Sequence, residues 1–142
     1  MNFAKKAAST LGALTAIAGL SLVNAPSAAA STPSGCANVS QVGSTRVIQI
    51  GGMDAASVKQ YYGCGYNYAY IYVWQQFRSA HSNWDLYVHV VNHSDSGNDY
   101  GDARLTNTTR SELWGPAADT AAFCTHATGY LNSTGGSTSK VC

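Results

Sequence analysis

Charged residues are scarce in this sequence, and the motifs that commonly reveal catalytic chemistry are missing. Only 11% of its residues are Asp, Glu, Lys or Arg, and the basic residues do not cluster. Because phosphate backbones are bound by clustered positive charge, we expect no nucleic-acid partner. The sequence contains neither a Gly-x-Ser-x-Gly segment nor a C-x-x-C pair. We therefore expect no metal ion and no cofactor.

The first thirty residues predict a secretory signal peptide rather than a part of the fold. Lys5 and Lys6 supply positive charge, residues 7–23 form an apolar run, and Ala28 to Ala30 offer small residues for cleavage. The run is too short and too rich in small residues for a transmembrane anchor, so we expect no membrane attachment after cleavage. The prediction is a secreted, extracellular protein that begins after Ala30.

All four cysteines lie in the part of the chain that follows this leader. An even number of cysteines in an oxidising compartment indicates two disulfides, although four cysteines allow three pairings. A hairpin folded about Ser133 would place Cys124 opposite Cys142, within reach of a disulfide. By elimination, Cys36 would then pair with Cys64.

Short segments in which apolar and polar residues alternate dominate residues 31–142, which are long enough for one domain. After an extended leader over residues 31–44, these segments predict strands. Residues 54–63 also fit a helix capped by Asp54, but we favour a strand. The expected fold is all-β, a small antiparallel β-sandwich or barrel stapled by two disulfides. The predicted strands cover residues 45–50, 54–63, 66–77, 85–93, 103–110 and 121–131.

The most distinctive segment alternates aromatic with small or aliphatic residues over 66–74. Because successive side chains of a strand point to opposite faces, one face carries an aromatic ladder and the other carries Ala69, Ile71 and Val73. Two arrangements are compatible with this pattern. Either a second sheet packs on the ladder, or the aliphatic face forms the core and the ladder is an exposed platform. The aromatic ladder consists of Tyr66, Tyr68, Tyr70, Tyr72 and Trp74.

A second strand, residues 85–93, alternates in the same way. We predict that it pairs with the ladder strand in an antiparallel hairpin that sets Ile71 opposite Val88. This register collects the aliphatic side chains on one surface. It also places Tyr87 and His89 beside the aromatic ladder.

The aromatic ladder and the missing catalytic motifs favour a binding function. We expect a secreted, non-enzymatic interaction protein, whether an inhibitor, an adaptor or a subunit of an exported complex, that binds a secreted or surface protein partner. A carbohydrate or cell-wall binding module is the alternative, because aromatic faces also stack on sugar rings. The predicted contact residues are Tyr66, Tyr68, Tyr70, Tyr72, Trp74, Tyr87 and His89.

A small hydrolase or nuclease is a weaker hypothesis, built from Glu112, Arg78 and one of the four histidines. Nothing in the spacing of these residues favours it. His89 and His93 share a strand face, but roughly 13 Å along the strand separates them, too far to hold one ion. The acidic loop over residues 92–102 lacks the spacing of an EF-hand, so we interpret it as a solvated turn.

Overall fold

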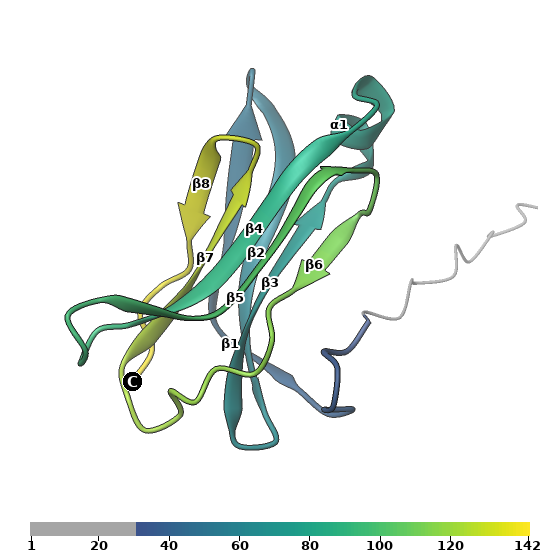
Figure 1. Ribbon diagram of the computed structural model, residues 1–142. Helices are drawn as coiled ribbons and strands as arrows, with labels where there is room; N and C mark the ends of the chain where they lie inside the picture. The colour runs from purple at the N-terminus through teal and green to yellow at the C-terminus, as the bar shows by residue number, and fades with distance from the viewer. Residues whose placement is uncertain (1–30) are drawn as a thin grey trace, which may run out of the picture.

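The computed structural model describes residues 31–142, and the expected signal peptide lies outside them. Two four-stranded antiparallel sheets pack face to face around one apolar core, which confirms the sandwich (Figure 1). Sheet A has the order β1-β2-β3-β6, and sheet B has the order β5-β4-β7-β8. No helix in this part of the chain is long and apolar enough to span a bilayer. The elements are β1 (Ser40–Ile50), β2 (Met53–Gly63), β3 (Tyr66–Val73), α1 (Gln75–Ala80), β4 (Trp84–Asn92), β5 (Asn98–Thr108), β6 (Glu112–Trp114), β7 (Thr125–Leu131) and β8 (Thr134–Ser137).

Tight turns join the first three strands into a meander. Gly51 and Gly52 connect β1 to β2 with φ angles of 59° and 77°. Residues that carry a side chain rarely adopt positive φ angles. Two such residues in succession give a two-residue turn whose twist matches that of the flanking strands. Gly65, with φ of 84°, follows in the turn between β2 and β3. Residues 54–63, whose pattern fits a helix or a strand, lie within β2, so the favoured strand is confirmed.

The expected hairpin between β3 and β4 is wrong, because the two strands lie in different sheets. β3 pairs with β2 and β6, whereas β4 pairs with β5 and β7. Helix α1 ends the predicted strand 66–77 early and carries the chain from one sheet to the other. Ile71 and Val88 meet in the core across the sandwich rather than side by side. Alternation specifies which face is buried, but not whether the facing strand is a neighbour or lies in the opposite sheet.

Strand boundaries differ from the prediction mainly at the sheet edges. β1 begins at Ser40, so the extended leader is shorter than residues 31–44, and β5 begins at Asn98 inside the expected loop. Each of these strands is the outer strand of its sheet. An edge strand tolerates polar residues because much of its surface faces water, so its composition resembles that of a loop.

The two sheets approach each other closely at Gly129 of β7. A Cβ at this position would lie 2.7 Å from Cγ2 of Val58 and 3.4 Å from Cδ1 of Ile71. Only hydrogen fits there without movement of the opposite sheet. Trp84 closes one side of the core and donates its indole hydrogen to the carbonyl of Arg110 at 2.9 Å.

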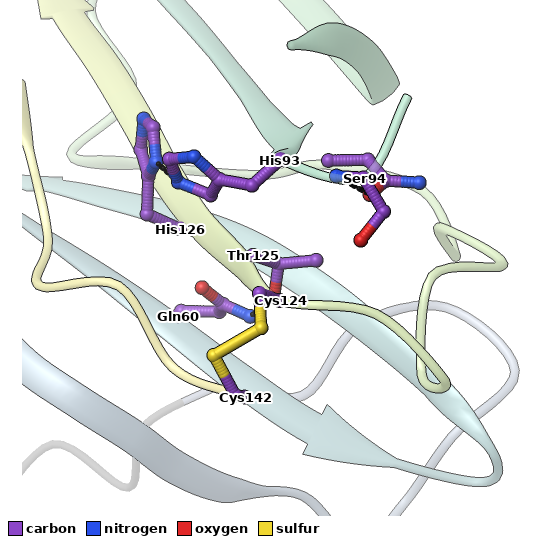
Figure 2. Close-up of a disulfide and its surroundings, with 8 residues drawn as sticks. Gln60, His93, Ser94, Cys124, Thr125, His126 and Cys142 are labelled. Carbon is purple, nitrogen blue, oxygen red and sulfur yellow. Dashed lines mark hydrogen bonds between the residues drawn. A yellow bond between two sulfur atoms is a disulfide. The ribbon is translucent and has the colours of Figure 1, made fainter. Parts of the chain in front are cut away.

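A buried polar network lies at the end of the core nearest to the C-terminal disulfide (Figure 2). Gln60 Nε2 of β2 donates to Oγ1 of Thr125 at 2.7 Å and to Oδ1 of Asn67 at 3.1 Å. Asn67 Nδ2 in turn donates to Oγ1 of Thr120 at 3.0 Å. Because Thr125 belongs to sheet B, these bonds join the two sheets. Oε1 of Gln60 has no hydrogen-bond partner within residues 31–142, so the network pairs only part of its buried polar atoms.

Both expected disulfides form, Cys36–Cys64 and Cys124–Cys142. The first ties the segment before β1 to the turn between β2 and β3, and the second ties the start of β7 to the last residue. Their sequence separations are 28 and 18 residues. Closing loops of this size stabilises a fold by about 3 kcal/mol each in the chain-entropy model.

The Gly129→Ala variant should lose about 1 to 3 kcal/mol of unfolding free energy, because the added methyl group meets the stiff side chain of Val58. Urea unfolding measures the loss. Gly135→Ala is the matched control, since the atoms nearest to its Cβ would be those of the Tyr130 ring on the outer face of sheet B. Equal losses in the two variants, or an unchanged midpoint for Gly129→Ala, would contradict the close approach of the sheets.

Candidate functional site

The aromatic ladder lies on the outer face of sheet A, and its middle is covered. Tyr68 and Tyr70 are only 2% and 5% exposed, whereas Tyr66 and Trp74 at the two ends are 40% and 37% exposed. Tyr72 is half-buried. Neither Tyr68 nor Tyr70 belongs to the core between the sheets. The expected open platform is therefore wrong for the middle of the ladder.

The segment before β1, residues 31–39, which we call the covering segment, covers Tyr70 together with Glu112 and Trp114. The Ser31 hydroxyl donates to Oε1 of Glu112 and accepts a hydrogen bond from the indole of Trp114 at 2.7 Å. The Tyr70 hydroxyl donates to the other carboxylate oxygen of Glu112 at 2.7 Å. The alternative in which the second sheet covers the ladder is also wrong, because sheet B packs on the aliphatic face.

Burial and aromatic packing make this side of the molecule a second packed layer. Cys36 of the covering segment is buried and disulfide-bonded. The ring centroid of Trp114 lies 4.4 Å from that of Tyr70 and 4.9 Å from that of Tyr61. Burial, reinforced by the hydrogen bond to Glu112, raises the pKa of Tyr70 well above its ordinary value, so the phenol stays a neutral donor.

Two of the predicted contact residues lie instead on the outer face of sheet B. Tyr87 and His89 of β4 point away from the core and form a cluster with Tyr130 of β7, which is paired with Tyr87. The ring centroid of Tyr87 lies 5.9 Å from that of Tyr130 and 5.0 Å from that of His89. Tyr130 is absent from the predicted contact residues, although its place in an alternating strand was an available signal.

An open cleft of about 600 Å³ adjoins these rings, and we call it the aromatic cleft. The guanidinium carbon of Arg104 lies 5.3 Å from the ring centroid of Tyr87. Oδ1 of Asp99 lies 3.4 Å from Nε2 of His89. The lining of the aromatic cleft consists of Asp85, Leu86, Tyr87, His89, Asp99, Arg104, Tyr130, Asn132 and Ser133.

Gly135 of β8 gives the Tyr130 ring room to lie over its neighbouring strand. The two residues are paired in the sheet, and a Cβ on Gly135 would lie 2.5 Å from Cε1 of the tyrosine. The ring thus occupies the space that any other residue would fill with its own side chain. The position of Tyr130 in the aromatic cleft depends on this glycine.

Two histidines on this face have lowered pKa values. Burial lowers the pKa of His89, and the charges of Asp99 and Asp102 partly oppose the shift. Burial and the neighbouring His93 lower the pKa of His126. Both imidazoles are therefore mainly neutral at pH 7.

Glu112 and two histidines of the hydrolase hypothesis lie in different sheets. Glu112 lies on the outer face of sheet A, where Tyr70 and Ser31 occupy its carboxylate. His89 and His126 lie on strands of the opposite sheet. The sandwich therefore separates Glu112 from these two of the four histidines that the hypothesis considered.

Comparisons of the chain with protein-family models, curated proteins and solved structures found no match. The functional interpretation therefore depends on the side chains themselves. The two disulfides are compatible with an extracellular location, where thiols are oxidised.

Stability should fall when the pH is lowered through about 6.5, because His89 and His126 have folded pKa values below that of the unfolded chain. The unfolded state then binds more protons, which favours unfolding. Urea midpoints measured between about pH 7.5 and 5.5 should decline. The decline should be smaller in His89→Gln than in the wild type. A midpoint that rises or stays constant on acidification would disprove this.

Proposed function

We propose that this chain is an exported, non-enzymatic carbohydrate-binding domain that holds its ligand in the aromatic cleft. The observation that carries the proposal is the pair of tyrosine rings, Tyr87 and Tyr130, set side by side among acidic, basic and amide side chains. Aromatic faces stack on the C–H faces of sugar rings. Carboxylate, guanidinium and amide groups form hydrogen bonds with the hydroxyls at the ring edge.

The two rings are held in fixed positions, which favours binding. Their planes are inclined by 33°, Arg104 lies over Tyr87, and Tyr130 fits over Gly135. Rings that are already ordered lose little conformational entropy when a ligand arrives. The aromatic cleft therefore supplies rigid stacking area of the kind that a sugar chain needs.

The polar groups of the aromatic cleft suit a ligand with many hydroxyls. Asp99 accepts hydrogen bonds and Arg104 donates them, so neighbouring hydroxyls of one sugar can serve both. At one end, the backbone N–H of Asp85 donates to Oδ1 of Asn132, and the backbone N–H of Asn132 donates to the carbonyl of Asp85, each at 2.9 Å. These reciprocal bonds fix that end of the cleft before a ligand binds.

A protein partner cannot contact the centre of the aromatic ladder, because Tyr68 and Tyr70 are buried. A different surface makes a protein partner the second candidate. Tyr62 and Phe123 are 44% and 45% exposed and line a cleft of about 230 Å³ with Val42 and Val141. Exposed aromatic side chains are typical anchors of protein interfaces. An exported protein that inserts an apolar side chain would fit this surface.

Tyr87→Ala and Tyr130→Ala should weaken binding to an insoluble polysaccharide by about tenfold or more, because each removes a stacking face. Sedimentation with peptidoglycan, chitin and cellulose measures the bound fraction. Gly135→Ala should also weaken binding, since it displaces the Tyr130 ring without removing it. Tyr66→Ala, on the opposite face, is the control and should bind like the wild type. The proposal fails if the wild type sediments with none of the three polymers, or if Tyr130→Ala binds normally.

If a protein partner uses the second surface, the double variant Tyr62→Ser, Phe123→Ser should no longer capture it from culture supernatant. Both side chains are exposed, so the fold should survive the change. Tyr130→Ala should capture the same partner as the wild type. A partner that is retained by the double variant, or no partner for the wild type, would count against this candidate.

A further inference from the structure

His93 and His126 form a pair at the end of sheet B that lies outside the aromatic cleft. Nε2 of His93 lies 2.7 Å from Nδ1 of His126, and the ring planes are inclined by 52° (Figure 2). At this distance one nitrogen carries the shared hydrogen and the other presents a lone pair. The two imidazoles therefore converge on one point.

The backbone fixes the separation of this pair. The N–H of His93 donates to the carbonyl of Cys124 at 2.9 Å, and His126 is paired with Val91 in the ladder between β4 and β7. Cys124 is bonded to Cys142, which holds the start of β7 in place. His93 is thus the first residue after β4, held by its backbone hydrogen bond to Cys124, whereas His126 is held within the ladder of β7.

We propose that His93 and His126 bind one divalent transition-metal ion of the class that imidazole prefers, namely zinc, nickel or copper. The ring that carries the shared hydrogen moves it, by exchange with water, to its other nitrogen, so both rings stay neutral and each facing nitrogen gives a lone pair to the ion. Zinc–nitrogen bonds of about 2.0 to 2.1 Å in tetrahedral geometry place the two nitrogens about 3.3 Å apart. The distance between Nε2 of His93 and Nδ1 of His126 must therefore grow by about half an ångström. Small rotations of the two side chains achieve this change.

Water completes the coordination of this ion. Within residues 31–142, no group of three or more His, Cys, Asp or Glu side chains is arranged to hold a metal. His89 lies roughly 13 Å along the chain from His93, and its Nε2 faces Oδ1 of Asp99 at 3.4 Å. A site with two protein ligands and open positions exchanges its ion with solvent, so binding is reversible and the fold does not require it.

Zinc titration of the protein, produced from the whole chain without a histidine tag, tests the proposal. Calorimetry should give one zinc ion per chain, and the NMR signals of the His93 and His126 rings should shift while those of His81 do not. Magnesium should produce neither effect, because it prefers oxygen ligands. A wild type that binds no zinc, or that binds it with shifts confined to other residues, overturns the proposal.

The variants His93→Ala and His126→Ala should each lose the zinc signal, because a single imidazole does not chelate the ion. Circular dichroism and the urea midpoint verify that each variant is folded. His81→Ala and His89→Ala are matched controls and should retain one bound ion. The assignment is wrong if either variant of the pair binds zinc like the wild type, or if His89→Ala abolishes binding. Polysaccharide sedimentation in the presence of a chelator should be unchanged, so this result is separable from the carbohydrate proposal.

Discussion

The contact between the aliphatic faces of β3 and β4, with β7 pressed against sheet A at Gly129, is the constraint on which the two outer surfaces depend. Because Ala69, Ile71 and Val73 are committed to the core, the alternate residues of β3 must point outward. The same holds for Tyr87 and His89 on β4. Each sheet therefore presents aromatic side chains on the face away from the core.

The two outer faces differ in how their aromatic side chains are arranged. On sheet A, the covering segment and Glu112 remove Tyr70 from water, and Tyr68 is buried as well. On sheet B, the tyrosines adjoin a cleft and are flanked by charged groups. Similar side chains thus serve packing on one face and line an open cleft on the other.

Local patterns in the sequence predicted much of this fold. Alternation located the strands around Ile71 and Val88, and the spacing around Ser133 predicted the Cys124–Cys142 disulfide. Alternation has a period of two whatever the partner strand, so it could not show that these strands face each other across the core. The strand order follows instead from α1, a short helix that sequence patterns did not reveal.

The candidate site was predicted only in part, for a related reason. Tyr87 and His89 were selected for their position beside the aromatic ladder, yet they lie on the other sheet with Tyr130. The burial of Tyr70 depends on Ser31 and Glu112, which are distant in sequence and carry no pattern that links them. Contacts of this kind are fixed by the tertiary arrangement, not by local periodicity.

The two disulfides also determine how the molecule would respond to mechanical force. Cys36–Cys64 encloses β1 and β2, and Cys124–Cys142 encloses β7 and β8, so neither bond links one sheet to the other. A load applied to the ends of residues 31–142 would pass through the sulfur atoms and bypass those four strands. Only the chain between Cys64 and Cys124 could extend, which makes β3, β4, β5 and β6 the elements that yield under tension.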